Sequence, residues 1–440
     1  MENYQRWRQY QKKLQRKDLQ KKRLRQSVWL LFLLVGVVLA VQFSKTNLSI
    51  GWFNASLDNE HRSENDRMGF GLIGDKELAD LIDTSDLFDS PDNTVDLHYS
   101  GKSYSVETTL DPDLQGYMTK KIQAARSPLI GFVAIDPTTG HVVTMIDRKK
   151  SRELGNVGLS STFPAASVFK IISATAAIDR GKLTADSTLT YNGRSHTLYK
   201  NQLKNGSNRY TNSVSLKDSF AKSINPAFGK LGVFCLKKDL LAEYAVRFGF
   251  NKPINFELPV EQSRFSIDNE PYHWAEIACG FNRETLISPI HGAMIASAIV
   301  NGGTLVEPTI VKYITDSKKN LVYSGDGGVT RQVMSPETSK EMMTLMAATI
   351  SRGTSRRAFK GYRRDRVLSK LALGGKTGSI KNDTDKWLYD WFVGYGAEKT
   401  GNRKLALAVL VVHGELLRAR AHEYARLALK YYFGKSSKVS

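Results

Sequence analysis

The distribution of apolar segments limits this chain to a small number of folds. Two segments with the composition of buried strands lie close together, at 129–135 and 141–146. Three more follow much later, at 371–378, 391–395 and 405–412, and the region between the two groups has mainly helical patterns. We therefore predict an α/β (α+β) fold, in which helices cover a five-stranded antiparallel sheet and a helical subdomain occupies the middle of the sequence.

A helix is expected on each side of these strands. Asp111-Pro112 is typical of a helix start, because proline is tolerated in the first turn. At the other end, residues 415–433 carry apolar side chains at helical spacing, and Leu416 and Leu417 are among them. We expect these apolar side chains to belong to the core. A further strand is predicted at 104–110, where apolar and polar residues alternate.

The N-terminal region has the pattern of a membrane anchor. Residues 1–27 carry ten Lys and Arg against two acidic residues, and residues 28–43 are uncharged and mainly apolar. The excess of positive charge predicts a cytoplasmic tail at 1–27 and a transmembrane signal anchor at 28–43. A cleaved signal peptide is the alternative, because Val38-Leu39-Ala40 resembles a cleavage site. The polar residues 44–100 are expected to form a juxtamembrane tether, and residues 101–434 a folded domain outside the cytoplasm.

Composition limits the partners less sharply. The net charge of +20 suits an anionic partner, such as anionic lipid or a polymer with phosphates and carboxylates, but it also fits simple solubility. Because no nucleic-acid-binding motif is present, we expect no nucleic acid partner. The two cysteines, Cys235 and Cys279, lack metal-ligand spacing, so neither a metal nor another cofactor is expected. Whether they form a disulfide stays open.

A serine and a lysine lie in the first turn of a predicted helix after Pro164. Ser167 and Lys170 are three positions apart, so their side chains share one helix face. A serine hydroxyl is a weak nucleophile until a base removes its proton, and a lysine amine can be that base if its pKa is lowered. This S-x-x-K pattern is weak alone, because a second copy occurs at Ser219 and Lys222.

Two more motifs decide between the copies. Ser223-Ile224-Asn225 and Lys376-Thr377-Gly378 follow Ser167 in order, whereas no S-x-N motif follows Ser219 at a useful distance. The ordered set resembles the transpeptidase domain of penicillin-binding proteins, within the serine penicillin-recognising family. The resemblance extends over about residues 108–433. It is imperfect, because Ala166 stands where relatives often have glycine, and residues 279–282 lack a frequent Gly-Gln-Gly.

The resemblance implies a β-lactamase/transpeptidase-like fold and roles for particular residues. Ser167 would attack the D-Ala-D-Ala end of a peptidoglycan stem peptide, and Lys170 would take its proton. Ser223 would relay a proton to the departing amine, and Asn225 would hold a peptide group. The backbone N–H groups of Ser167 and Ser379 would form the oxyanion hole.

The third motif would bind the substrate's terminal carboxylate. Lys376, a catalytic residue, would also lower the pKa of Lys170, together with a mostly enclosed cleft. Thr377 and Ser379 would donate hydroxyl hydrogen bonds to the carboxylate. Gly378 would let the substrate backbone lie close against the strand.

The implied activity is that of a monofunctional serine D,D-transpeptidase, which cross-links stem peptides and binds penicillin and other β-lactams covalently through Ser167. A D,D-carboxypeptidase and a non-catalytic penicillin-binding sensor or scaffold are alternatives. A β-lactamase is disfavoured, because the chain has no Glu-x-x-Leu-Asn loop. Residues 44–100 are too few for a glycosyltransferase domain, so a membrane glycan polymerase is an expected partner. The expected location is the bacterial plasma membrane, with a single pass.

Overall fold

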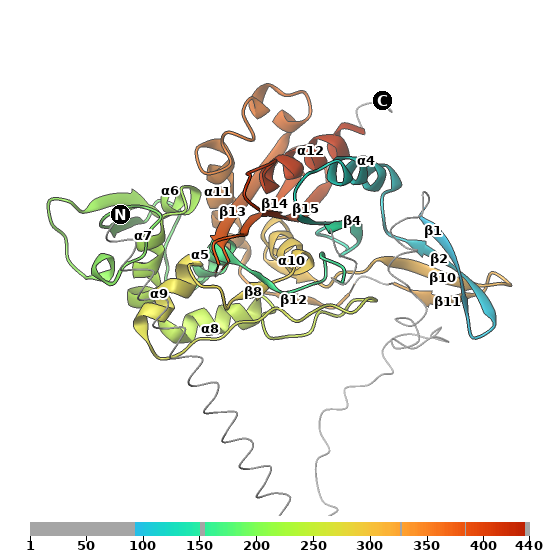
Figure 1. Cartoon of the computed structure of the whole chain (residues 1–440), viewed down its shortest axis with the longest axis horizontal. Coiled ribbons are helices and arrows are strands. Elements are labelled where there is room, and N and C mark those ends of the chain that lie inside the picture. Colours follow the sequence, from blue (N-terminus) through green and yellow to red (C-terminus); the bar gives the residue numbers. More distant parts are fainter. Residues whose placement is uncertain (1–92, 150–154, 326–327, 383, 436–440) are drawn as a thin grey trace, which may run out of the picture. The chain divides into compact units, whose positions relative to one another are not determined.

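A five-stranded antiparallel sheet lies at the centre of the described part of the chain, which in this computed structural model comprises residues 93–149, 155–325, 328–382 and 384–435 (Figure 1). The strand order is β13-β14-β15-β3-β4, and neighbouring strands are antiparallel. The strands are β3 (Leu129–Ile135), β4 (Val142–Lys149), β13 (Leu371–Lys381), β14 (Leu388–Glu398) and β15 (Lys404–His413). The predicted five-stranded sheet is therefore confirmed, although most strands extend beyond their predicted ends.

The pairing of β15 with β3 joins the two distant groups of strands. Ala406 lies opposite Ile135, and Val412 lies opposite Leu129. In the other neighbouring pairs, which are β3–β4, β13–β14 and β14–β15, the two strands are consecutive along the chain. This one long-range pairing places β13, which carries the third motif, at one edge of the sheet.

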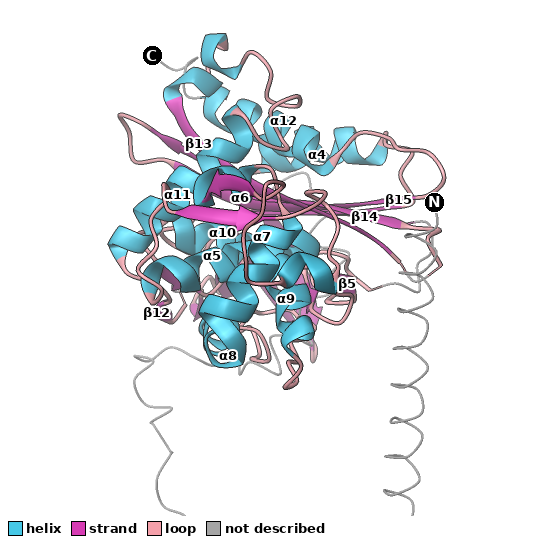
Figure 2. Ribbon diagram, turned by 90° about the vertical axis from the view of Figure 1, so that its left-hand side faces the viewer, coloured by secondary structure: helices cyan, strands magenta, loops and turns pink. Residues whose placement is uncertain are grey.

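Helices cover both faces of the sheet. Along β15, Leu407 and Val409 belong to one apolar cluster, whereas Ala408 and Leu410 belong to the other, as the two-residue period of a strand requires. The first face is covered by α4 (Pro112–Gln123) and α12 (Ala421–Gly434), and the second by α10 (Pro289–Val300) (Figure 2). Every residue of α10 is buried, which fits a helix that is apolar all round.

Most of the remaining helices form the predicted helical subdomain and its connections to the sheet. They are α5 (Lys170–Asp179), α6 (Leu216–Ala221), α7 (Asn225–Lys230), α8 (Lys237–Arg247), α9 (Pro271–Cys279) and α11 (Pro336–Ser351). Helix α7 continues as a π-helical segment, η3 (Leu231–Leu236). Short 3₁₀ segments are η1 (Ala166–Phe169), η2 (Lys200–Leu203), η4 (Tyr362–Arg364) and η5 (Leu368–Lys370).

A second, four-stranded sheet was not predicted, although one of its strands overlaps the strand predicted at 104–110. Its order is β1-β2-β10-β11, and its strands are β1 (Thr94–Tyr99), β2 (Lys102–Thr108), β10 (Val311–Asp316) and β11 (Leu321–Ser324). Because β1 pairs with β2 along its whole length, the folded domain begins before residue 101. The predicted tether at 44–100 was therefore wrong in its last residues.

Three two-stranded pairs complete the described secondary structure. They are β5 (Phe163–Pro164) with β8 (Leu286–Ile287), β6 (Thr188–Tyr191) with β7 (Asn212–Ser215), and β9 (Thr304–Val306) with β12 (Thr330–Gln332). The first pair matters most for the site, because β5 leads directly into η1.

Two details of the C-terminal region differ from the predictions. Helix α12 begins at Ala421 rather than at residue 415, because Arg420 has extended backbone angles. Leu416 and Leu417 lie in the loop before it and are 62% and 63% exposed, so their assignment to the core was wrong.

The cysteines are both free, so the open question of a disulfide is answered: Cys235 and Cys279 do not pair.

The predicted membrane anchor at 28–43 lies outside the described residues. Within the part of the chain that the structure describes, none of the helices combines the length and the apolar character needed to cross a membrane.

Candidate active site

The candidate nucleophile lies in a tight turn between β5 and α5. Ser167 belongs to η1, and the preceding Ala166 has a φ of +49°, a left-handed conformation that favours glycine. This explains physically why a glycine would be suited to the position. A hydrogen bond fixes this turn to the central sheet: the indole Nε1 of Trp391 on β14 donates to the carbonyl of Pro164 at 2.9 Å. The neighbouring Gly280 is packed so closely that a Cβ there would collide with the carbonyl oxygen of Ala166.

Lys170 is buried beside the serine. It is the first residue of α5, and its amine donates to Oγ of Ser167 at 2.9 Å. The same amine donates to Oδ1 of Asn225 at 2.9 Å and to the backbone carbonyl of Cys279. The side chain of Lys170 is fully buried, so three protein oxygens replace water around the amine. The first two motifs are therefore in direct contact.

Ser223 lies in the link between α6 and α7, and Asn225 is the first residue of α7. Ser223 has a φ of +57°, which turns the chain sharply between the two helices. The backbone N–H of Asn225 donates to the carbonyl of Ser195 at 2.7 Å, and this bond fixes the link against the 192–197 loop. Both side chains are at least nine-tenths buried. A left-handed serine is uncommon, and such strain is concentrated at functional sites.

Lys376 joins the third motif to the second. It lies in β13, and its amine donates to Oγ of Ser223 at 3.0 Å and to the carbonyl of Thr377 at 2.7 Å. The side chain of Lys376 is fully buried. All five residues predicted as catalytic therefore lie together, in two hydrogen-bonded groups: Ser167–Lys170–Asn225 and Ser223–Lys376.

The surroundings of both lysines disfavour their charged forms. Burial lowers the pKa of Lys170 to about 8. The pKa of Lys376 is well below its ordinary value, because of burial and of the charge on Lys170. The two amines lie over the rings of Phe228 and Phe220, each 5.6 Å from the ring centroid, and both rings are fully buried. The lowered pKa of Lys170 was predicted from an enclosed cleft and from the charge of Lys376, and burial is its main cause.

The residues predicted to bind substrate follow along β13. Oγ1 of Thr377 lies 2.6 Å from Oγ1 of Thr354. A Cβ added at Gly378 would lie 3.2 Å from both the carbonyl oxygen of Ala165 and Cγ2 of Val168. The structure thus gives Gly378 a further reason to be glycine: it lets β13 approach the nucleophile turn. The hydroxyl of Ser379 is exposed and lies beside Asp390 and Arg420.

The second S-x-x-K copy does not form such a site. Ser219 is fully buried within α6, whereas Lys222 is exposed at the end of that helix. Among the described residues, no cluster of His, Cys, Asp or Glu is placed so that it could hold a metal ion.

Comparison with known proteins identifies the family to which the chain belongs. Residues 130–430 match the family model for the penicillin binding protein transpeptidase domain, which is more than half of the chain. The chain belongs to the penicillin-binding protein transpeptidase family. The resemblance identified from the ordered motifs is therefore confirmed.

Two curated relatives illustrate the membership. Stage V sporulation protein D of Bacillus subtilis is 27% identical over 313 residues, which cover 67% of this chain and 47% of that protein. The peptidoglycan D,D-transpeptidase PbpA of Mycobacterium tuberculosis is 24% identical over 353 residues, covering 70% of this chain and 67% of that protein. The chain thus spans about half to two thirds of the length of these relatives.

Solved structures share the fold. The D,D-transpeptidase domain of a peptidoglycan glycosyltransferase from Eggerthella lenta has a TM-score of 0.62 at 20% identity, over 76% of this chain and 84% of that one. The imipenem acyl-enzyme complex of penicillin-binding protein A from M. tuberculosis has a TM-score of 0.61 at 22% identity, over 74% of this chain and 79% of that one. The penicillin-binding transpeptidase fold of this chain is established by these matches together.

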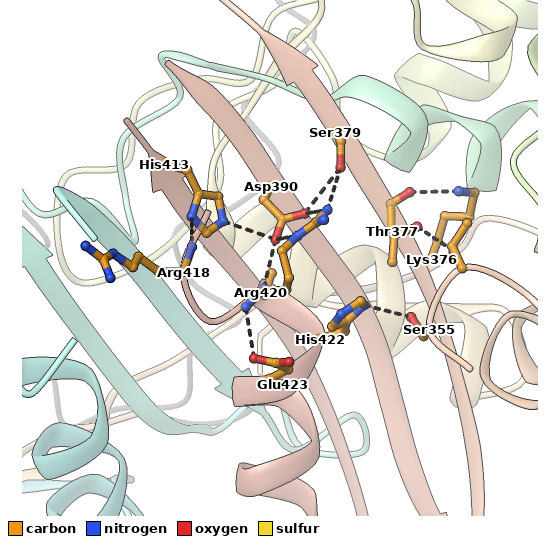
Figure 3. A network of polar contacts seen from close by, with 12 residues as sticks. Ser355, Lys376, Thr377, Ser379, Asp390, His413, Arg418, Arg420, His422 and Glu423 are labelled. Atoms are coloured by element: carbon orange, nitrogen blue, oxygen red, sulfur yellow. Dashed lines mark hydrogen bonds and ion pairs between the residues drawn. The ribbon is translucent and has the colours of Figure 1, made fainter. Parts of the chain in front are cut away.

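Two residues at the site were missed in the sequence. Asp390 on β14 and Arg420 before α12 contact the Ser379 hydroxyl (Figure 3). Asp390 could have been noticed as a lone acidic residue at the start of the apolar run 391–395. Arg420 carries no such signal, because it is one of two arginines in the loop before α12.

Proposed function

We propose that this chain is a serine D,D-transpeptidase that cross-links peptidoglycan stem peptides through an acyl-enzyme on Ser167 and binds penicillin covalently at the same residue. The observation that carries the proposal is the buried amine of Lys170, 2.9 Å from Oγ of Ser167, with a pKa lowered to about 8. With this pKa, about one tenth of the amine is neutral at pH 7, and a neutral amine at hydrogen-bond distance is what a serine nucleophile needs.

Acylation would use the two hydrogen-bonded groups in turn. Oγ of Ser167 forms a bond to the carbonyl carbon of the penultimate D-Ala, and its proton passes to the amine of Lys170. The bond from that carbon to the nitrogen of the terminal D-Ala then breaks. The proton that Lys170 took up passes to the departing nitrogen, relayed by Ser223, whose hydroxyl accepts a hydrogen bond from Lys376 at 3.0 Å.

The remaining site residues would position the substrate. Asn225 keeps its amide N–H₂ available for a substrate peptide carbonyl, because its Oδ1 is used by Lys170. The oxyanion would be bound by the backbone N–H groups of Ser167 and Ser379, each typically worth about 3 kcal/mol. Thr377, Ser379 and Lys376 would bind the terminal carboxylate. The β-lactams would enter as analogues of the same peptide end.

A labelled penicillin tests the nucleophile. We expect the wild-type chain to be labelled once per molecule and Ser167→Ala to remain unlabelled. The matched control is Ser219→Ala, which changes the serine of the second S-x-x-K copy and should leave labelling unchanged. Labelling that survives in Ser167→Ala, or disappears in Ser219→Ala, would overturn the assignment.

A second assay separates transpeptidation from hydrolysis. The acyl-enzyme is formed with a D-Ala-D-Ala stem peptide in the presence of a free amine acceptor, and the two products are counted. Transfer to the amine in preference to water supports the transpeptidase, whereas hydrolysis at all acceptor concentrations would make the chain a D,D-carboxypeptidase.

The proposal includes a place for the enzyme in the cell. In this proposal residues 1–27 form a cytoplasmic tail, residues 28–43 form a single membrane anchor, and a tether extends from residue 44 to the start of β1. The charge and hydropathy pattern of the sequence supports this assignment. The catalytic domain then lies on the outer side of the bacterial plasma membrane. A membrane glycan polymerase would be the partner, and co-purification from detergent-solubilised membranes tests it: full cross-linking activity by the chain alone would count against it.

A further inference from the structure

Asp390 is a buried carboxylate on β14, the strand next to β13, which carries the third motif. It lies opposite Ser379 in the pairing of β13 with β14 and is 2% exposed. Arg420 holds it with two bonds, from Nε to Oδ2 at 2.8 Å and from Nη2 to Oδ1 at 2.6 Å. The backbone N–H of Ala421 donates a third, at 2.9 Å. The first turn of α12 is therefore fixed to the sheet beside the candidate site (Figure 3).

The pair is charged under ordinary conditions. Burial alone would raise the pKa of Asp390, but the hydrogen bonds from Arg420 and the nearby His413, whose Nε2 lies 3.5 Å from Oδ2, outweigh burial and lower this pKa to about 2. The bond with Asp390 in turn raises the pKa of Arg420. A planar guanidinium that binds both carboxylate oxygens has little freedom to turn, which an ammonium group would retain.

The Ser379 hydroxyl lies between the two partners. Nη2 of Arg420 donates to Oγ of Ser379 at 3.1 Å, and the hydroxyl proton has Oδ1 of Asp390 as an acceptor at 3.2 Å. That last contact is longer than the bonds from Arg420 and Ala421 to Asp390. Because Asp390 is already saturated by those stronger donors, it is a weak competitor for the serine proton. An entering carboxylate that is less occupied by donors can take this proton without leaving Asp390 unpaired.

Arg420 is also positioned to act on that proton. Its side chain is 33% exposed, so the guanidinium is at the edge of the site and not sealed behind it. A cation on the lone pair of a hydroxyl polarises the O–H bond and strengthens its donation on the other side. Lys376 is less suited to supply a permanent charge, because it is fully buried and bonded to Ser223.

We propose that Arg420 is a positioning residue that sets the preference of this enzyme for ligands with a free terminal carboxylate, acting through the hydroxyl of Ser379. This inference rests on the proposed function, since it concerns ligands that acylate Ser167. Asp390 has the supporting role of holding the guanidinium in place.

The test compares two probes on each variant of the full chain. One is a labelled penicillin with its free carboxylate, and the other is the methyl ester of the same penicillin. The second-order rate of acylation is measured for both, and their ratio is the preference for the carboxylate. Because both rates come from the same active molecules, partial unfolding of a variant cancels in the ratio.

We expect Arg420→Gln to lower this ratio by about 10- to 100-fold, the value of a charge-assisted hydrogen bond, with little change in the rate for the ester. Ser379→Ala should lower it similarly, and the double variant should lower it no further, because both substitutions interrupt one path. The matched control is Arg418→Gln, which removes the same charge from an exposed position of the same loop and should leave the ratio unchanged.

Three results would overturn the inference. In Arg420→Gln, equal losses for the two probes, which leave the ratio unchanged, would indicate a purely structural role, and wild-type rates for both probes would indicate no role. Losses that multiply in the double variant would show that Arg420 does not act through Ser379. If instead the wild-type chain is not acylated at Ser167 by either probe, the proposed function itself fails, which is a distinct outcome.

Discussion

The titration of Lys170 makes the sharpest prediction for the proposed mechanism. The amine must be neutral to take the proton of Ser167, and its pKa of about 8 means that about one tenth of it is neutral at pH 7. At pH 9 about nine tenths is neutral. Because only the neutral form acts as a base, acylation by a penicillin should become faster as the pH rises, by about tenfold between pH 7 and 9, and then level off.

The assay is the second-order rate of acylation by a labelled penicillin, measured from pH 6 to 10 within the range where the fold is intact by circular dichroism. Lys170→Arg should slow acylation at every pH, by about 100- to 10,000-fold, because a guanidinium keeps its proton and the general base is lost. Lys222→Arg is the matched control: it makes the same change in the second S-x-x-K copy, at an exposed position, and should keep the wild-type profile.

Two outcomes would refute this reasoning. A rate that is constant or falls between pH 6 and 9 would mean that deprotonation of Lys170 does not limit acylation. Activity near the wild-type level in Lys170→Arg would mean that another group takes the proton of Ser167.

Four shorter predictions concern the surroundings of the site. Trp391→Phe removes the donor to the carbonyl of Pro164 and should lower the free energy of unfolding in urea by about 1–3 kcal/mol. Gly378→Ala brings a Cβ to 3.2 Å from its neighbours and should cost about 1–3 kcal/mol in the same assay, with slower acylation. Leu417→Ser, at an exposed loop position, should change stability by less than about 0.5 kcal/mol, and a larger loss would restore Leu417 to the core. Cys279, buried and with a pKa raised to about 12, should resist iodoacetamide at pH 8 until the chain is unfolded, and rapid alkylation of the folded chain would contradict its burial.

The central sheet was predictable because its strands are long and strongly apolar. The residues of β15 from Leu405 to Val411 are fully buried, and such a run permits few alternatives to a central strand. The four-stranded sheet was not predictable in the same way. Only one residue of β1, Leu97, is buried, and β2 finds its neighbour β10 some two hundred residues later. Weak local patterning and long-range pairing together hide such an element.

The limits at the site have a similar origin. The sequence identified Ser167, Lys170 and Lys376 because these residues belong to short motifs that occur in a recognisable order along the chain. The contact of Arg420 with Ser379 depends on where α12 begins and on how its first turn meets β14. The prediction that α12 starts at residue 415 would have placed Arg420 inside the helix, and this boundary error hides the contact.

In the proposed mechanism, two requirements that conflict for a single lysine would be met by different residues. A base beside Ser167 must be neutral, and burial of Lys170 serves that purpose. A site for a terminal carboxylate needs a lasting positive charge, but a second buried lysine next to the first is also pushed toward neutrality, as the lowered pKa of Lys376 indicates. A guanidinium in a partly exposed position avoids the conflict, since Asp390 strengthens its hold on the proton. If Arg420 supplies the lasting charge, Lys376 is free to remain neutral until an anionic ligand enters. The base function of Lys170 then does not depend on the positive charge that attracts the ligand's carboxylate.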